Sequence, residues 1–195
     1  MARRQAILDA ARLLFLERGY DGISMSDVVE RAGGSLATVY ACFGSKEGLF
    51  DAILDELSAE IAAPLLELDI DRRSPREALQ RVGESFLTRI LRADALAWYR
   101  MCVTEGPSHP GLRAALFRAG PGRLRDRLGR YLEAQARAGR LRIEHGPLAA
   151  AQFLSLVKAA IHMEAICGEP IASDARSIRA HVSKAVELFL NGCSS

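Results

Sequence analysis

The sequence has few aromatic side chains and almost none of the patterns that indicate β-strands. Aromatic residues make up 6% of the 195 residues, and alternating runs of Val, Thr and Tyr are nearly absent. Alanine, leucine, arginine and glutamate dominate instead, and these residue types favour helices. The sequence therefore predicts an all-α fold, and a chain of this length can bury a sizeable core without disulfides.

Motifs that carry enzyme chemistry are missing as well. The sequence contains no G-x-S-x-G, Walker A or glycine-rich dinucleotide motif. None of its four histidines is paired with another at i, i+4, and its four cysteines stand far apart without C-x-x-C spacing. We therefore expect free thiols, no catalytic residues, no metal site and no cofactor, and an enzyme is the least favoured class.

Two further absences concern location. No charged segment followed by an apolar one indicates a signal peptide, and no continuous apolar run approaches the ~20 residues that cross a bilayer. We therefore expect a cytoplasmic protein with no membrane partner.

Charge gives only a weak argument for nucleic acid. The net charge is +2, and residues 1–50 contain as many Asp and Glu as Lys and Arg. A DNA-binding surface must therefore depend on where the charges are placed rather than on an excess of them.

The stretch from 24 to 49 predicts two short helices joined by a glycine turn and followed by the start of a third. Ser24 and Asp27 form a Ser-x-x-Asp capping box at the start of the first, and Gly33-Gly34 end it. Ser35 caps the second. The larger side chains of this second helix recur at helical spacing, at Leu36, Val39, Tyr40 and Phe43. Helix, tight turn and helix form the helix-turn-helix pattern, whose second helix can enter the DNA major groove.

From Gly19 to Phe50 these residues resemble, in register, the DNA-binding region of the TetR/AcrR family of bacterial regulators. The matching positions are Gly19-Tyr20, Asp27-Val28, Ala32-Gly33, Ser35, Thr38-Val39-Tyr40, Phe43, Ser45-Lys46-Glu47 and Leu49-Phe50. The stretch AGPGRLRDRLGRYLEAQARAGRLR further resembles the C-terminal domain of the AefR-like subgroup. The resemblance implies a homodimeric, all-helical repressor that a small-molecule effector releases from a double-stranded DNA operator.

We expect a three-helix DNA-binding domain over residues 1–48 and a helical effector-binding and dimerisation domain over 49–195. The first domain begins with a helix at about 3–18, and a longer helix runs from Ser45 toward Pro64. Further helices are expected at about 75–91, 94–105, 112–119, 123–138, 147–166 and 173–191.

DNA contacts are expected at the start of the second helix of the motif and at the charges around it. The resemblance implies that the first turn of this helix faces base edges and that the residues after it hold phosphates. Thr38 can donate to a phosphate or contact a thymine methyl group, whereas Leu36 and Ala37 offer only apolar contact. Arg3 and Arg4 are either phosphate contacts or solvated terminal charges. The full set is Arg3, Arg4, Ser24, Ser35, Leu36, Ala37, Thr38, Tyr40 and Lys46.

Two positions depart from the family pattern. Ala41 and Cys42 stand where the family often has aromatic residues or histidine, and this removes two possible backbone contacts. The departure keeps open an alternative function, in which the chain is a helical ligand-binding or scaffolding protein with weakened DNA affinity. The helix also lacks Arg, Asn and Gln, which make bidentate base contacts, so it does not indicate an operator sequence.

The last two expected helices are apolar over a broad arc and must bury more than one side. We therefore expect a homodimer that forms through them. An effector pocket is implied by the resemblance, with aromatic rings as its apolar wall and His162 or Glu105 as a polar contact, although each such residue is more often ordinary core. The candidate lining residues are Phe86, Trp98, Met101, Cys102, Glu105, Phe117, Phe153 and His162.

Overall fold

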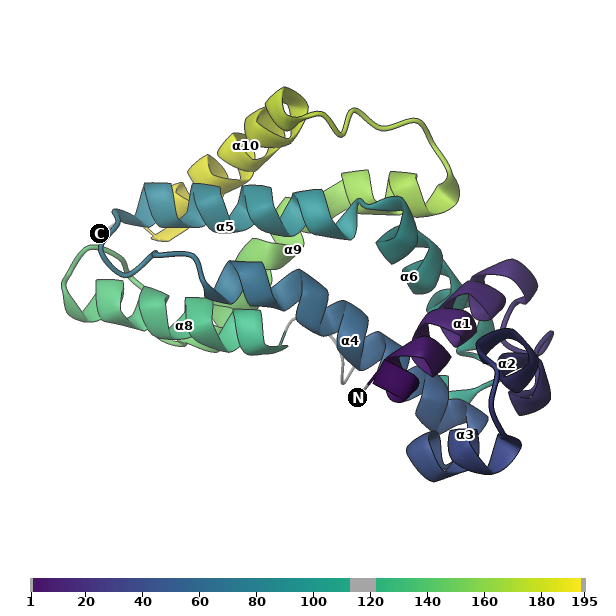
Figure 1. The fold of residues 1–195 in the computed structure, drawn as a ribbon. Helices are drawn as coiled ribbons and strands as arrows, with labels where there is room; N and C mark the ends of the chain where they lie inside the picture. Colours follow the sequence, from purple (N-terminus) through teal and green to yellow (C-terminus); the bar gives the residue numbers. More distant parts are fainter. Residues whose placement is uncertain (1, 113–121, 194–195) are drawn as a thin grey trace. The chain divides into compact units, whose positions relative to one another are not determined.

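A computed structural model of the protein describes residues 2–112 and 122–193, and within these ranges every regular element is a helix. The all-α prediction is thereby confirmed (Figure 1). The helices are α1 (Ala2–Arg18), α2 (Met25–Ala32), α3 (Leu36–Phe43), α4 (Lys46–Leu66), α5 (Pro75–Ile90), α6 (Ala93–Glu105), α8 (Gly122–Arg137), α9 (Gly146–Cys167) and α10 (Ala175–Cys193). The helix expected at 112–119 falls almost wholly outside the described residues.

The described residues form two compact units. The N-terminal unit contains residues 2–59 and 97–112, and the C-terminal unit contains 60–96 and 122–193. Along the chain, α4 and α6 each begin in one unit and end in the other. The DNA-binding domain expected over 1–48 thus lies within a unit that also holds most of α6.

The core of the N-terminal unit is built around aromatic rings. Phe15 of α1 packs edge-on against Phe50 of α4, with ring centroids 5.2 Å apart. Trp98 of α6 lies 5.3 Å from Phe50 and 6.0 Å from Phe15. Three helices that are distant in the sequence are therefore held by one buried cluster.

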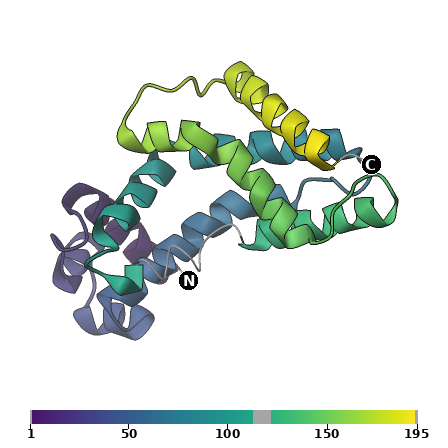
Figure 2. The same cartoon turned by 180° about the vertical axis from the view of Figure 1, so that it is seen from behind.

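The C-terminal unit is organised around α9, which contacts α5, α8 and α10 (Figures 1 and 2). Phe153 of α9 is fully buried and packs against Phe189 of α10 at 5.3 Å. The α5 helix begins with a capping box in which Ser74 and Glu77 bond reciprocally, and Pro75 takes its first position. The proline and the capping box together explain why the helix begins at the position expected, about residue 75.

A kink interrupts α9 that the sequence did not predict. Ala159 has φ 32° and ψ −145°, so it leaves the helical region inside the helix. The His181 side chain of α10 lies with Nε2 2.9 Å from the carbonyl oxygen of Val157. The Val157 carbonyl, two residues before Ala159, therefore has a hydrogen-bond partner from α10. Buried backbone carbonyl groups require such partners.

By length and composition α9 could also cross a membrane, although the sequence holds no continuous apolar run of ~20 residues. Core helices of soluble proteins pass the same test. In this structure α9 packs against three other helices of its unit.

The α8 and α9 helices are in close backbone contact at Gly129. A Cβ atom at this position would lie 2.8 Å from the backbone nitrogen of Pro147 and 3.0 Å from the carbonyl carbon of Gly146. Both contacts are to backbone, which cannot swing aside, so the helix pair depends on the absence of a side chain here.

We predict that Gly129→Ala destabilises the protein by about 1–3 kcal/mol, the usual cost of overpacking. In an ordinary helix the same change stabilises, by roughly 1 kcal/mol. Gly192→Ala is the control, because a Cβ there meets nothing within 4 Å. Denaturant unfolding followed by circular dichroism measures both, and a Gly129→Ala protein as stable as the unmodified chain would contradict the packing described.

Candidate DNA-binding interface

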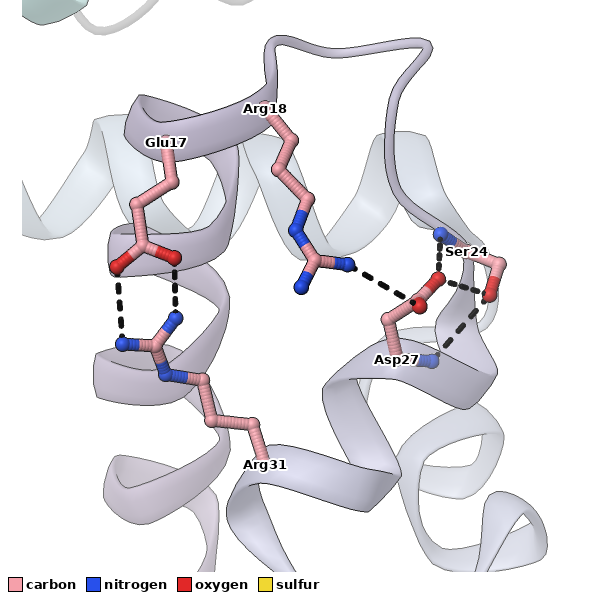
Figure 3. A network of polar contacts seen from close by, with 5 residues as sticks. All are labelled: Glu17, Arg18, Ser24, Asp27 and Arg31. Carbon is pink, nitrogen blue, oxygen red and sulfur yellow. Dashed lines mark hydrogen bonds and ion pairs between the residues drawn. The ribbon is translucent and has the colours of Figure 1, made fainter.

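The start of α2 is fixed by the capping box that the sequence predicted. The Ser24 side chain accepts a hydrogen bond from the backbone N–H of Asp27 at 3.2 Å, and Asp27 Oδ2 accepts from the Ser24 N–H at 2.7 Å (Figure 3). The Ser24 hydroxyl also donates to the Asp27 carboxylate. These bonds from the hydroxyl and backbone of Ser24 lower the pKa of Asp27. In this conformation both donors of Ser24 are occupied, and the residue acts as a helix cap.

Two ion pairs join α2 to the end of α1. Arg31 of α2 binds the Glu17 carboxylate through both terminal nitrogens, at 2.5 and 2.9 Å (Figure 3). Arg18 lies 3.5 Å from the Asp27 carboxylate. The hydrogen bond from Arg31 lowers the pKa of Glu17. Because all four side chains are solvent-accessible, these pairs orient the helices more than they stabilise them.

The turn between α2 and α3 depends on two glycines and one arginine. Gly33 and Gly34 have φ of 73° and 90°, which side-chain-bearing residues rarely adopt. Arg3 of α1 donates to the carbonyl oxygen of Ala32 at 2.9 Å and also to that of Gly33. The Arg3 guanidinium thus satisfies carbonyls at the end of α2 and stands beside the turn.

The α3 helix is capped by Ser35, whose side chain accepts from the Thr38 N–H at 3.2 Å. The Ser35 and Thr38 hydroxyls lie 2.9 Å apart. Val39 is fully buried, whereas Leu36 and Tyr40 are 40% and 47% exposed. Ala37 and Ala41 are exposed too, so one face of α3 anchors the helix and the opposite face is open to a partner.

Two cations near α3 rest on aromatic rings. The Lys46 ammonium lies 4.4 Å from the centroid of the Tyr20 ring, and the Arg4 guanidinium lies 5.2 Å from that of Phe43. Partial burial lowers the pKa of Lys46, although the carboxylates of Asp21, Asp27 and Glu105 oppose this shift. Both contacts are cation–π interactions. Arg4 is exposed, and such a contact is weak enough at an exposed site for the cation to move to a phosphate.

The residues expected to line an effector pocket are divided between the two units. Trp98, Met101 and Cys102 belong to the core of the N-terminal unit, and Glu105 lies in the same unit. Burial raises the pKa of the Cys102 thiol to about 12. Trp98, Met101 and Cys102 thus pack α6 against the other helices of this core. The sequence did not indicate which helices they contact.

Three of the other candidates lie in the C-terminal unit. Phe86 and Phe153 are part of its core, and His162 is buried. Burial, together with the charge of Lys158, lowers the pKa of His162 to about 4, so the ring is neutral at pH 7. Phe117 lies outside the described residues.

Sequence reasoning also missed a polar groove in the C-terminal unit. It has a volume of about 840 Å³. Residues of α5 and α10 and of the segments directly before and after α5 line it, and Glu77 and Glu84 are among them. Its arginines are Arg73, Arg76, Arg81, Arg89, Arg92 and Arg179. The arginine content of residues 73–92 is the sequence signal that marks it.

Comparison with protein families gives matches to both halves of the chain. Residues 7–53 match the family described as bacterial regulatory proteins, tetR family. Residues 77–192 match the C-terminal domain of AefR-like transcriptional repressors.

Two curated proteins of Escherichia coli (strain K12) are similar over part of the chain. The HTH-type transcriptional repressor ComR is 47% identical over 108 residues, which are 55% of this chain and 46% of ComR. The HTH-type transcriptional repressor BdcR is 40% identical over 81 residues, which are 42% of this chain and 41% of BdcR. Each match thus spans less than half of the relative's length.

Solved structures are similar over nearly the whole chain. The flavonoid-responsive regulator FrrA has a TM-score of 0.82 and 27% identity, covering 99% of this chain and 97% of FrrA. A TetR-family transcriptional regulator of Mesorhizobium loti MAFF303099 has a TM-score of 0.81 and 21% identity, covering 100% and 98% of the two chains. At 21% identity the second likeness concerns the fold alone.

We predict that Asp27→Asn removes a stabilising contribution that depends on pH. Because the folded pKa of Asp27 lies below its ordinary value of 3.8, this contribution is present above pH 3.8 and is lost as the pH falls through the folded pKa. Unmodified and Asp27→Asn proteins should therefore differ most at neutral pH and converge in acid. Thermal unfolding across this pH range is the measurement, with Glu30→Gln on the same helix as control. An equal difference at every pH would contradict the role of the charged cap.

Proposed function

Because the chain belongs to the TetR family of bacterial regulatory proteins and carries an AefR-like C-terminal domain, we propose that it is a DNA-binding transcriptional repressor. A small-molecule effector would release it from a double-stranded operator. The family consists of transcriptional regulators, which usually act as dimers, and ComR and BdcR are both repressors. We place the protein in the cytoplasm, where its DNA is.

The observation that carries the proposal is the open face of α3. Leu36, Ala37 and Tyr40 project from a helix whose other side is fixed by the buried Val39 and whose first turn is capped by Ser35. A short helix that is anchored on one side and exposed on the other can enter the major groove. Leu36 and Ala37 would contact base edges through apolar groups, thymine methyl groups above all.

Phosphate contacts would surround this helix. The Tyr40 phenol is exposed, and Thr38 lies at the N-terminal turn of α3, where unpaired N–H groups attract anions. Lys46 begins α4, while Arg3 and Arg4 stand beside the α2–α3 turn and Phe43. Ser24 would support DNA binding indirectly, by capping α2. Its backbone N–H and its hydroxyl both donate to the Asp27 carboxylate and so are not available to a phosphate.

Ala41 and Cys42 are exposed on α3 and offer no strong phosphate donor. The competing function, a helical ligand-binding or scaffolding protein with weak DNA affinity, rests on these two positions. The two functions differ in salt dependence, because affinity that comes from phosphate contacts falls steeply as the salt concentration rises.

A dimer would form through α9 and α10. Leu188 of α10 is 63% exposed, and Met163 and Leu148 of α9 are 59% and 55% exposed. Large apolar side chains exposed on two neighbouring helices are typical of a surface that a second subunit covers. Two-fold symmetry would then set two α3 helices at the spacing of successive major grooves.

The effector would bind in the C-terminal unit. Of the candidates there, Phe86 and Phe153 supply apolar surface and the neutral His162 a hydrogen-bonding group. Phe153 is fully buried, so an effector that reaches it must part the core helices. Such a ligand binds two conformations with different affinity, which is the condition for release from DNA. The likeness to the flavonoid-responsive FrrA supports a small organic effector.

We predict that Lys46→Gln weakens binding to all duplexes alike and reduces the slope of log affinity against log salt by about one. Fluorescence anisotropy at several salt concentrations, on the upstream region of the protein's own gene and on random duplex, measures the effect. Arg130→Gln, which removes an exposed charge from α8 in the C-terminal unit, should leave the slope unchanged. Equal slopes for the Lys46→Gln and unmodified proteins would exclude Lys46 as a phosphate contact. Equal affinity of the unmodified protein for both duplexes would favour the scaffolding function.

We predict that Leu188→Glu converts the dimer to monomers, because it places a charge in an apolar subunit contact. Sedimentation at micromolar concentration measures the mass. Val103→Glu is the matched control, since Val103 is 49% exposed on α6, outside α9 and α10. A Leu188→Glu protein that sediments as the unmodified chain does would show that the dimer forms elsewhere.

A further inference from the structure

Three potential metal ligands converge in the N-terminal unit. The carboxylates of Asp21 and Glu105 and the ring of His109 offer donor atoms that all lie within 4.8 Å of one another. Among the described residues no other set of three such side chains does so. His109 Nε2 lies 3.1 Å from Asp21 Oδ1.

The backbone after α6 places the side chains of Glu105 and His109 on the same side of one turn. Glu105 is the last residue of α6, and the His109 N–H donates to the Glu105 carbonyl oxygen at 3.0 Å. The chain therefore makes one more helical turn after α6, with Glu105 and His109 at i and i+4. This spacing places two side chains on the same metal ion in helical zinc sites. The sequence prediction missed this pair because one of its members is a glutamate rather than a second histidine.

Asp21 comes from the turn after α1, and the neighbouring Tyr20 holds the histidine. The rings of Tyr20 and His109 lie 4.6 Å apart, and the Tyr20 ring is itself stacked on Phe15 of the aromatic core. Glu105 and His109 are half-buried, whereas Asp21 is exposed. Packing thus limits the rotamers of His109, and an ion could enter from the Asp21 side.

We propose that Asp21, Glu105 and His109 bind one divalent transition-metal ion of the Zn²⁺ or Mn²⁺ class. Two carboxylates balance the charge of such an ion, and an imidazole ligand favours it over Mg²⁺ or Ca²⁺. Ligands about 2.1 Å from an ion lie about 3–3.5 Å from one another, so the 3.1 Å between His109 and Asp21 suits two ligands of one ion. With three protein ligands, the remaining coordination positions of the ion would be taken by water.

The Lys46 ammonium, which lies over the Tyr20 ring, is the competing cation. Asp21 and Glu105 both attract it. A bound ion neutralises these carboxylates and ends their attraction for Lys46, which leaves the ammonium available to a phosphate. This coupling rests on the proposed DNA-binding function, whereas metal binding itself does not.

The test is equilibrium dialysis and calorimetry of the full-length chain with ZnCl₂ or MnCl₂ in the absence of DNA. We expect one ion per chain, and Asp21→Asn and His109→Asn should each weaken binding by about tenfold or more. The control is His145→Asn, because His145 is an exposed histidine that caps α9 and asparagine caps equally well. This variant should bind as the unmodified chain does.

The Asp21→Asn variant distinguishes loss of a metal ligand from misfolding. Its fold should be unchanged, because the Asp21 side chain is 73% exposed. Its helical circular dichroism should equal that of the unmodified chain without metal. The absorption spectrum of the Co²⁺-loaded chain reports coordination directly, and it should change in both ligand variants. The proposal is overturned if the unmodified chain binds no ion, or if Asp21→Asn and His109→Asn bind it as tightly as the His145→Asn control.

Discussion

Phe15, Phe50 and Trp98 meet ring against ring in the N-terminal unit, with centroids 5.2–6.0 Å apart, and the arrangement of α1, α4 and α6 depends on this contact. Aromatic pairs at these distances stabilise by about 0.5–1.5 kcal/mol beyond the burial of their area. Tyr20 stacks on the same cluster and in turn carries Lys46 and His109 on its ring. One apolar contact thus sets the positions of charged groups on the surface.

The polar contacts around α2 and α3 have a different task. Capping by Ser24 and Ser35 fixes where each helix begins, and the pairs Arg31–Glu17 and Arg18–Asp27 fix how α2 lies on α1. None of these contacts buries much surface. They determine the direction of α3 relative to its support, and base contact in a major groove requires this direction.

The features that the sequence predicted well are those whose partners are close in the chain. The capping box joins residues three positions apart, and α1 spans the helix expected at about 3–18. The ring partners of Trp98, which are Phe15 and Phe50, lie far away in the sequence, so local patterns could not predict that these three rings meet. The Asp21–His109 contact spans 88 positions and carries no local signal. The Ala159 kink likewise arises where α9 packs against α5 and α10, so helical propensity alone gave no sign of it.

The ion pairs beside α3 also bear on how many copies of the protein a cell needs. Glu17 and Asp27 engage Arg31 and Arg18, and residues 1–50 carry no excess of positive charge. Attraction to arbitrary duplex comes almost wholly from unpaired positive charge, so the rest of a genome competes weakly for such a protein. For the repressor that we propose, few molecules would then be held at random sites, and a small number of them would keep one operator occupied.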